Sequence, residues 1–293
     1  MATSETGKGK LYLCPTPIGN LSDMSQRGLD VLESVDLIAA EDTRNTINLL
    51  NHYGISSHMT SYHEHNKYDK ADEIIRKLSE GMNVACVTDA GTPGISDPGE
   101  ILVKKAIEAG IDVVSLPGAT AFVTALTVSG LSTRRFVFEG FLPRDKKERQ
   151  RVLNAIKNET RTIILYEAPH HLKDTLEILD RTLGGDRRIA ACRELTKIHE
   201  EILRMSIREM SAYYREREPR GEYVLVIEGR PIEELESMKR EAYEGISVSR
   251  HVQRYMDCGM DKKEAMKKAA VDRGVSKRDI YQMLLLEEDQ KNP

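Results

Sequence analysis

The chain has 293 residues and a formal net charge of −4, and 40% of its residues are hydrophobic while 31% are charged. These proportions are typical of a soluble globular protein, and no apolar stretch approaches the roughly 20 residues that cross a bilayer. The acidic balance argues against a protein coated with basic side chains for nucleic acid. Because the length exceeds one typical domain, we expect two domains and an appendage.

The cysteines are far apart in the sequence and form no CxxC pair: Cys14, Cys86, Cys192 and Cys258. This spacing favours reduced thiols and suggests neither disulfides nor a zinc site. The first ten residues contain no apolar segment of the signal-peptide kind. We therefore expect a cytoplasmic protein.

Two segments are basic although the chain as a whole is acidic. Residues 134–161 contain nine Lys and Arg against four Asp and Glu, and residues 239–279 contain eleven against seven. They are either surfaces that face an anion or ordinary solvated helices whose charges lean one way. Composition alone does not decide between the two interpretations.

The first part of the chain, residues 1–131, alternates strand and helix patterns and is expected to form an α/β domain with a parallel sheet. Short apolar stretches predict strands at 11–17, 36–42, 58–64, 83–87 and 111–118. Amphipathic patterns predict helices at 22–35, 44–54, 69–81, 101–110 and 119–130. Ser22 or Asp23 is the expected N-cap of the first helix.

The second part, residues 132–231, is expected to form an α/β domain with a mixed sheet, because some of its predicted strands follow one another directly. Residues 232–293 are expected to form a polar linker and a helical C-terminal extension. Gly259 and Gly274 divide this extension into three short helices, of which the last begins at Ser276. The outline fits a small helix-turn-helix unit, and equally a helical tail that packs on the body or on a second subunit.

The stretch TDAGTPGISDPGE, residues 88–100, joins a predicted strand to a helix and is rich in glycine, proline and acids. Gly91 and Gly94 let a ligand approach the backbone, and ligands of open α/β sheets bind at this edge. Without a P-loop lysine and with Asp89 and Asp97 nearby, phosphate is a poor candidate. The loop suits S-adenosylmethionine, which is cationic, although a purely structural turn explains it as well.

Other turns at the same edge strengthen the interpretation as a site. PTPIGN (15–20), AEDTR (40–44), SYHEHN (61–66) and LPGATA (116–121) all follow predicted strands. His63, Glu64 and His65 are candidate metal ligands, but no second cluster completes a coordination shell. We therefore expect no metal.

Several stretches together resemble the tetrapyrrole-methylase superfamily, and within it the RsmI-type branch that methylates the 2′-oxygen of a cytidine in 16S ribosomal RNA. The resemblance rests on TPIGNLSDMSQRGLDVLESVDLIAAEDTRNT, TDAGTPGISDPG, LPGATA, GFLPR, LYEAPHHL, CRELTKIHEE and GEYVLVIEG. Corrin and sirohaem enzymes have Gly-Asp-Pro where this chain has Gly91-Thr92-Pro93. The branch usually has Arg at the position of His171, so a contact made there would be weaker and dependent on pH.

The resemblance implies two α/β domains with S-adenosylmethionine in the cleft between them, and a homodimer. The positions that match the cofactor contacts of the family are Pro17, Ile18, Thr92, Pro93, Ile95, Thr120, Ala121, Ala168, Leu195 and Gly221. The implied acceptor is the 2′-hydroxyl of the cytidine at position 1402 in the decoding centre of 16S rRNA, in the small ribosomal subunit.

Transfer to a hydroxyl requires alignment and benefits from a base or a cation nearby. Asp42, Glu64 and His65 are candidate bases, and Arg44 and Lys197 are expected to hold the ribose phosphate. Lys197 is also a candidate catalytic residue, with Asp42 and His65. The RNA is expected to be gripped by the helical tail and by Arg134, Arg135, Arg144, Lys146 and Lys147. Two alternatives remain: a methyltransferase acting on a small tetrapyrrole-like substrate, and a non-catalytic RNA-binding ribosome factor.

Overall fold

The computed structural model describes residues 7–289, and its contacts divide the chain into two compact units. The first unit contains the chain up to Leu153 together with Thr162–Glu228, and it carries both β-sheets. The second unit contains Asn154–Arg161 and the chain from Gly229 onward, and it is helical. No helix among the described residues is long and apolar enough to cross a membrane.

The first sheet has five parallel strands in the order β3-β2-β4-β1-β5, as the alternating pattern predicts. Its strands are β1 (Leu11–Leu13), β2 (Leu37–Ala40), β3 (Met59–Ser61), β4 (Val84–Val87) and β5 (Val113–Ser115). The helices between them are α1 (Gln26–Ser34), α2 (Thr43–His52), α3 (Lys67–Ser79) and α4 (Gly99–Glu108). Because all strands run the same way, the loops that follow them meet at one edge.

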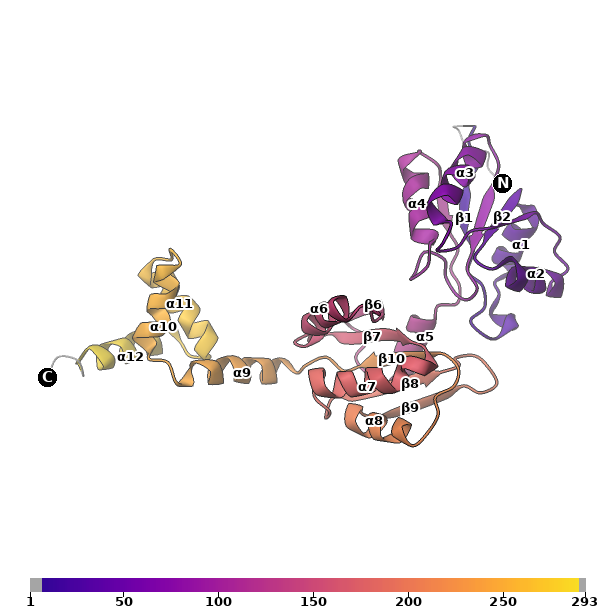
Figure 1. The fold of residues 1–293 in the computed structure, drawn as a ribbon. Coiled ribbons are helices and arrows are strands. Elements are labelled where there is room, and N and C mark those ends of the chain that lie inside the picture. Colours follow the sequence, from indigo (N-terminus) through magenta and orange to yellow (C-terminus); the bar gives the residue numbers. More distant parts are fainter. Residues whose placement is uncertain (1–6, 290–293) are drawn as a thin grey trace. The chain divides into compact units, whose positions relative to one another are not determined.

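Helices cover both faces of this sheet (Figure 1). Ile74 of α3 and Leu102 of α4 pack on the face to which Leu11 of β1 points. Leu32 of α1 packs on the opposite face, to which the next strand residue, Tyr12, points. The strands are buried on both sides, which explains why they read as continuous apolar runs rather than alternating ones.

The second sheet is mixed, with the order β6-β7-β10-β8-β9, in which only β6 and β7 are parallel. Its strands are β6 (Phe136–Phe141), β7 (Thr162–Glu167), β8 (Arg188–Arg193), β9 (Glu201–Ser206) and β10 (Tyr223–Ile227). The accompanying helices are α5 (Ala121–Val128), α6 (Lys146–Ile156), α7 (Pro169–Leu183) and α8 (Ile207–Arg215). Helices α7 and α8 pack against each other, and α5 packs against β7 and β10, so the helix predicted to close the first domain contributes to the core of the second sheet. The two-sheet α/β architecture predicted from the sequence is confirmed.

The N-cap of the first helix differs from the prediction. Ser22 and Asp23 lie in a short 3₁₀ turn, η1 (Leu21–Asp23), in which the Asn20 side chain accepts a hydrogen bond from the Ser22 N–H at 3.0 Å. Helix α1 begins only at Gln26, and the Ser25 hydroxyl accepts a hydrogen bond from the Gly28 N–H at 3.1 Å. Four residues with a capping oxygen precede the helix, Asn20, Ser22, Asp23 and Ser25; the tight turn uses the first of them and the helix uses the last.

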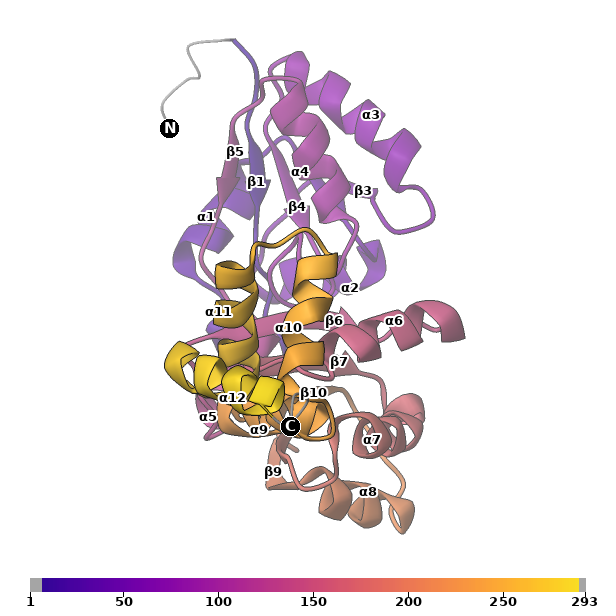
Figure 2. The same cartoon turned by 90° about the vertical axis from the view of Figure 1, so that its left-hand side faces the viewer.

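The helical unit comprises α9 (Ile232–Glu244), α10 (Val248–Asp257), α11 (Lys262–Arg273) and α12 (Lys277–Asp289). The predicted three-helix extension corresponds to α10, α11 and α12 (Figure 2). These helices share a small apolar core built around Val252, Ala269 and Ile280. The segment predicted as a polar linker is largely the helix α9, which packs on α11. The domain boundaries at residues 131 and 231 stay a prediction.

Candidate functional site

The loops after β1 and β4 are fastened to each other at the carboxyl edge of the first sheet. Thr16 and Gly91 form an isolated antiparallel bridge, in which each N–H donates to the other's carbonyl at 3.0 Å. The Thr16 hydroxyl also donates to the Thr88 carbonyl at 3.0 Å. Gly91 has a φ of +85°, a conformation that other residues rarely adopt, so the tight crossing depends on glycine.

The carboxylate of Asp97 holds the shape of the loop that follows Gly91. It accepts hydrogen bonds from the N–H groups of Gly94, Ile95 and Gly99, at distances between 2.7 and 3.1 Å. Burial raises the pKa of Asp97, although these hydrogen bonds oppose the shift. One of the acids that the sequence interprets as ligand-facing therefore serves the loop itself.

Further hydrogen bonds join this loop to the segment before α5. The Thr92 hydroxyl donates to the Ala119 carbonyl at 3.0 Å and lies 2.7 Å from the Thr120 hydroxyl. Together with the Thr16–Gly91 bridge, these bonds connect the loops after β1, β4 and β5. The backbone here is held in place before any ligand binds.

The loop after β8 carries unusual backbone angles beside the same edge. Glu194 and Thr196 have φ values of +50° and +66°, and Gly221, next to them, has +75°. A Cβ atom built at Gly221 would lie 2.5 Å from the Glu194 side chain, so Gly221 gives Glu194 its space. Left-handed conformations of non-glycine residues cost energy and concentrate at functional sites.

The first of two cavities, here called the Thr92 cavity, has a volume of about 420 Å³ and lies entirely within the first unit. Ile18, Thr92 and Thr120 line it from the loops that follow strands of the first sheet. Tyr166 of β7 and Leu195, which follows β8, line it from the side of the second sheet. Phe141 and Tyr166 meet edge to face on one side, with ring centroids 5.4 Å apart. The carboxylates of Glu41 and Glu194 also line it.

The second, here called the Asn48 cavity, has a volume of about 410 Å³ and also lies within the first unit. One wall is the loop after β1, with Pro17, Ile18 and Leu21, and the other is helix α2 with Asn45 and Asn48. Both cavities have the volume of ordinary small-ligand sites.

The two cavities share part of their lining, which includes Ile18, Thr88, Lys197 and Glu222. The Lys197 ammonium lies 2.9 Å from the Glu194 carboxylate and 3.2 Å from that of Glu222. Although burial alone would lower it, the hydrogen bond to Glu194 and the charge of Glu222 raise the pKa of Lys197, so the ammonium stays charged. A fixed positive charge thus lies where the cavities adjoin.

Most of the positions predicted to contact the cofactor line the Thr92 cavity: Ile18, Thr92, Ile95, Thr120, Ala121, Ala168 and Leu195. Pro17 lines the Asn48 cavity instead. Pro93 is buried next to Thr92, and Gly221 supports Glu194 from outside the lining. The positions named through the resemblance thus come from around both sheets, and most of them line one cavity.

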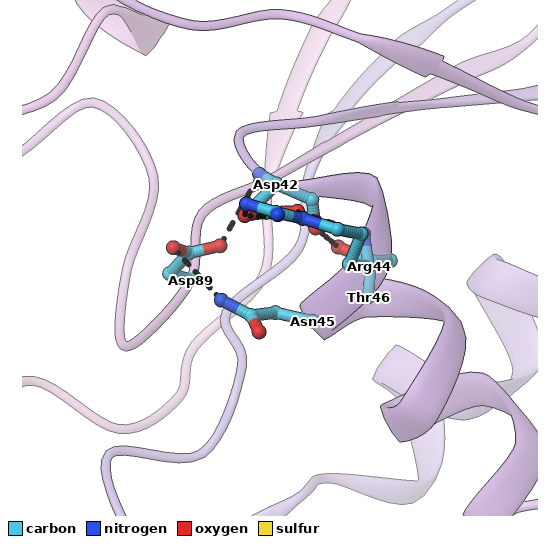
Figure 3. Close-up of polar contacts among 5 residues, drawn as sticks. All are labelled: Asp42, Arg44, Asn45, Thr46 and Asp89. Atoms are coloured by element: carbon cyan, nitrogen blue, oxygen red, sulfur yellow. Dashed lines mark hydrogen bonds and ion pairs between the residues drawn. The ribbon is translucent and has the colours of Figure 1, made fainter.

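Among the predicted catalytic residues, only Lys197 lines a cavity. Asp42 is the N-cap of α2, and its carboxylate pairs with the Arg44 guanidinium at 2.6 Å (Figure 3). The hydrogen bond from Arg44 lowers the pKa of Asp42 to about 2, which makes it a weak base at neutral pH. His65 is exposed after β3 and lines neither cavity.

The residues predicted to grip RNA are all exposed and line neither cavity: Arg134, Arg135, Arg144, Lys146 and Lys147. The first two precede β6, and the others lie at the start of α6. Within residues 7–289, no group of three or more His, Cys, Asp and Glu side chains is arranged to hold a metal ion, and Glu64 pairs with Lys67.

Sequence reasoning missed the side chains of helix α2 that line the Asn48 cavity. Asn45, Asn48, Leu49 and His52 recur at the spacing of one helical face and line the cavity together with Thr46, whereas Leu50 packs in the core. The signal available in the sequence was a helical face rich in amides that follows the AEDTR turn directly.

Comparisons with known proteins identify the family of this chain. Residues 10–211 match the family model of the tetrapyrrole (corrin/porphyrin) methylases. The uroporphyrin-III C-methyltransferase of Thermus thermophilus, solved as a complex with S-adenyl homocysteine, has a TM-score of 0.54 and 15% identity, covering 75% of this chain and 97% of that one. At this identity the likeness shows a shared fold.

Sequence relatives are much closer. A protein of Bacillus subtilis (strain 168) named ribosomal RNA small subunit methyltransferase I is 50% identical over 273 residues, which are 93% of each chain. The protein of the same name from Escherichia coli O157:H7 is 44% identical over 285 residues, which are 97% of each chain. The similarity thus extends through the helical unit as well as both sheets.

Proposed function

Because the chain belongs to the tetrapyrrole (corrin/porphyrin) methylase family, we propose that it transfers a methyl group from S-adenosylmethionine to ribosomal RNA of the small subunit. The proposed acceptor is the 2′-hydroxyl of a cytidine in the decoding centre of 16S rRNA. The single observation that carries the proposal is the pair of adjoining cavities that share Lys197 and Glu222. One cavity suits a cofactor and the other suits an acceptor.

The lining of the Thr92 cavity fits S-adenosylmethionine. Ile18, Ala121 and Leu195 offer apolar surface, Phe141 and Tyr166 offer aromatic edges, and Glu41 and Glu194 provide carboxylates for cationic groups. When bound, the cofactor supplies an electrophilic methyl carbon on a sulfonium sulfur. The loops around Thr92 are already joined by hydrogen bonds, so binding of the cofactor would require little further ordering of the backbone.

Lys197 is the residue we assign to the chemistry at the acceptor oxygen. A 2′-hydroxyl held at the shared wall becomes more negative as its proton leaves, and an ammonium nearby stabilises that charge. Glu222, whose side chain is 80% exposed, lies beside Lys197 and can accept the proton and pass it to solvent. Asp42, which the sequence offered as a base, is committed to Arg44 and the start of α2.

A small tetrapyrrole-like substrate is the weaker alternative, although it shares the fold and the cofactor. Such substrates carry several carboxylates. Glu41, Asp89 and Glu222 around the cavities would repel them, and Lys197 is already paired with two carboxylates. The acidic lining therefore favours an RNA acceptor, whose negative charges lie on phosphates that can stay outside the cavity.

Methyl transfer from labelled S-adenosylmethionine to small ribosomal subunits tests the proposal. The subunits come from cells that lack this protein, and the modified nucleotide is mapped by mass spectrometry. We expect label at one 2′-O-methylcytidine in the decoding centre. A chain that binds the cofactor but labels neither subunits nor free rRNA would act on another acceptor or serve as a non-catalytic ribosome factor.

A further inference from the structure

The lining of the Asn48 cavity combines apolar and polar side chains. Pro17, Ile18 and Leu21 face it from the loop after β1, and Leu49 faces it from α2. Asp89 lines it from the loop after β4. A flat, partly apolar group with polar atoms along one edge matches these walls, and a nucleobase is such a group.

Two of its polar residues, Asp89 and Asn45, come from different elements and point toward each other (Figure 3). The Asn45 amide nitrogen donates to the Asp89 carboxylate at 3.1 Å, and the same carboxylate accepts from the Asp42 N–H at 3.2 Å. An ionised carboxylate only accepts, so the NH₂ group of Asn45 must be the one that faces it.

Both side chains keep hydrogen-bonding capacity for a ligand. A carboxylate accepts about four hydrogen bonds, of which Asp89 uses two here, and an amide NH₂ donates two, of which Asn45 uses one. The pair therefore presents an acceptor beside a donor. Partial burial and the charge of Glu41 raise the pKa of Asp89, while the residue as a whole stays exposed and can be reached by a ligand.

We propose that the Asn48 cavity takes the base of the acceptor nucleotide and that Asp89 and Asn45 select cytosine over uracil. Cytosine presents an amino donor at N4 beside an acceptor at N3, the complement of this pair. Uracil presents an acceptor at O4 and a donor at N3. O4 would face the Asp89 carboxylate, which is also an acceptor, and N3–H would face the Asn45 NH₂ group, which is also a donor. The inference rests on the proposed function, because it assumes an RNA acceptor.

Asp89 and Asn45 are exposed in the free protein, and a base bound over them would cover both, so that the wrong base would leave their polar groups unpaired. Sites built to hydrogen-bond one pattern reject the other by up to about 10⁴-fold, whereas a difference of shape alone gives about 10- to 200-fold. The base of the acceptor nucleotide must leave the stack of neighbouring bases to enter the Asn48 cavity, as in other enzymes that enclose a target base. The single-stranded character of the target would lower that cost.

The test compares small subunits that carry cytidine or uridine at the nucleotide that the wild-type protein methylates. The wild type is expected to prefer cytidine by more than about 100-fold in kcat/KM. Asp89→Asn keeps the shape but can turn an NH₂ group toward O4, so the cytidine-to-uridine ratio should fall at least about tenfold. Asn45→Ala should lower the same ratio through loss of the donor to N3. As Asn45 is exposed, this variant should fold even where Asp89→Asn does not.

Matched controls lie on surfaces that line neither cavity. Asn51→Ala makes the same change on α2, and Asp186→Asn makes the same change at a side chain that is 89% exposed; both should keep the wild-type ratio. If the wild type methylates cytidine and both site variants keep its ratio, the base-selection inference is wrong while the proposed function stands. If the wild type labels no cytidine at all, the proposed function fails first.

Discussion

At the scale of single residues, the site depends on charges that are paired before any substrate arrives. Lys197 is held between Glu194 and Glu222. Glu194 has a left-handed backbone conformation, and Gly221 leaves space for its side chain. An ammonium fixed in this way needs no reorganisation when negative charge develops next to it. Residues held against their backbone preference are expected where position matters more than stability.

Replacing Lys197 tests this role directly. We expect Lys197→Ala to lower the single-turnover rate of methyl transfer by roughly 10²- to 10³-fold, as the loss of one charge-stabilising donor does in other enzymes. Affinity for S-adenosyl homocysteine should change much less. The control is Lys173→Ala, which removes a lysine paired with the exposed Glu218 on another surface and should leave the rate unchanged. A rate loss below about threefold for Lys197→Ala would remove it from the chemistry.

At the scale of elements, the sequence predicted most of the architecture because it is encoded locally. Short apolar runs followed by amphipathic stretches specify the five parallel strands and their helices, and the loops after them necessarily share an edge. The Ser25 cap was missed because Asn20, Ser22 and Ser25 all offer a capping oxygen, and the 3₁₀ turn that decides among them depends on neighbouring backbone.

The site was less predictable than the fold, since its contacts join elements far apart in sequence. Asn45 meets Asp89, and Lys197 meets Glu222, through folds of the chain that no local pattern encodes. The cofactor positions could be named only through the resemblance, and their lining of one cavity is a tertiary result. Asp42 stood in a suggestive motif, but its carboxylate is used as a helix cap.

The exposed basic start of α6 carries a prediction of its own. Neutralising Arg144, Lys146 and Lys147 to glutamine should weaken binding to ribosomal RNA or subunits and lower the slope of log affinity against log salt by up to about 2. Removing Lys173, Arg181 and Arg208 in the same way changes the net charge equally on α7 and α8. That control should leave the slope unchanged, and equal effects of the two triple variants would show that only net charge matters.

At the scale of the whole molecule, the chain combines a two-sheet unit that contains both cavities with a helical unit that has its own apolar core. In the proposed function, the substrates are aligned inside the cavities, and the exposed basic segments contact RNA phosphates outside them. The homodimer and the cytoplasmic location expected from the resemblance and the composition stay predictions.

The central claim is that one cavity holds the cofactor and its neighbour holds the acceptor. Calorimetric titration of S-adenosyl homocysteine into two variants, paired with methyl-transfer assays on small subunits, tests it most directly. Thr92→Arg should abolish cofactor binding and activity together, because it fills the Thr92 cavity. Asn48→Arg should leave cofactor binding within about threefold of wild type and abolish transfer to RNA. Intact cofactor binding in Thr92→Arg, or loss of it in Asn48→Arg with the fold retained, would contradict this account.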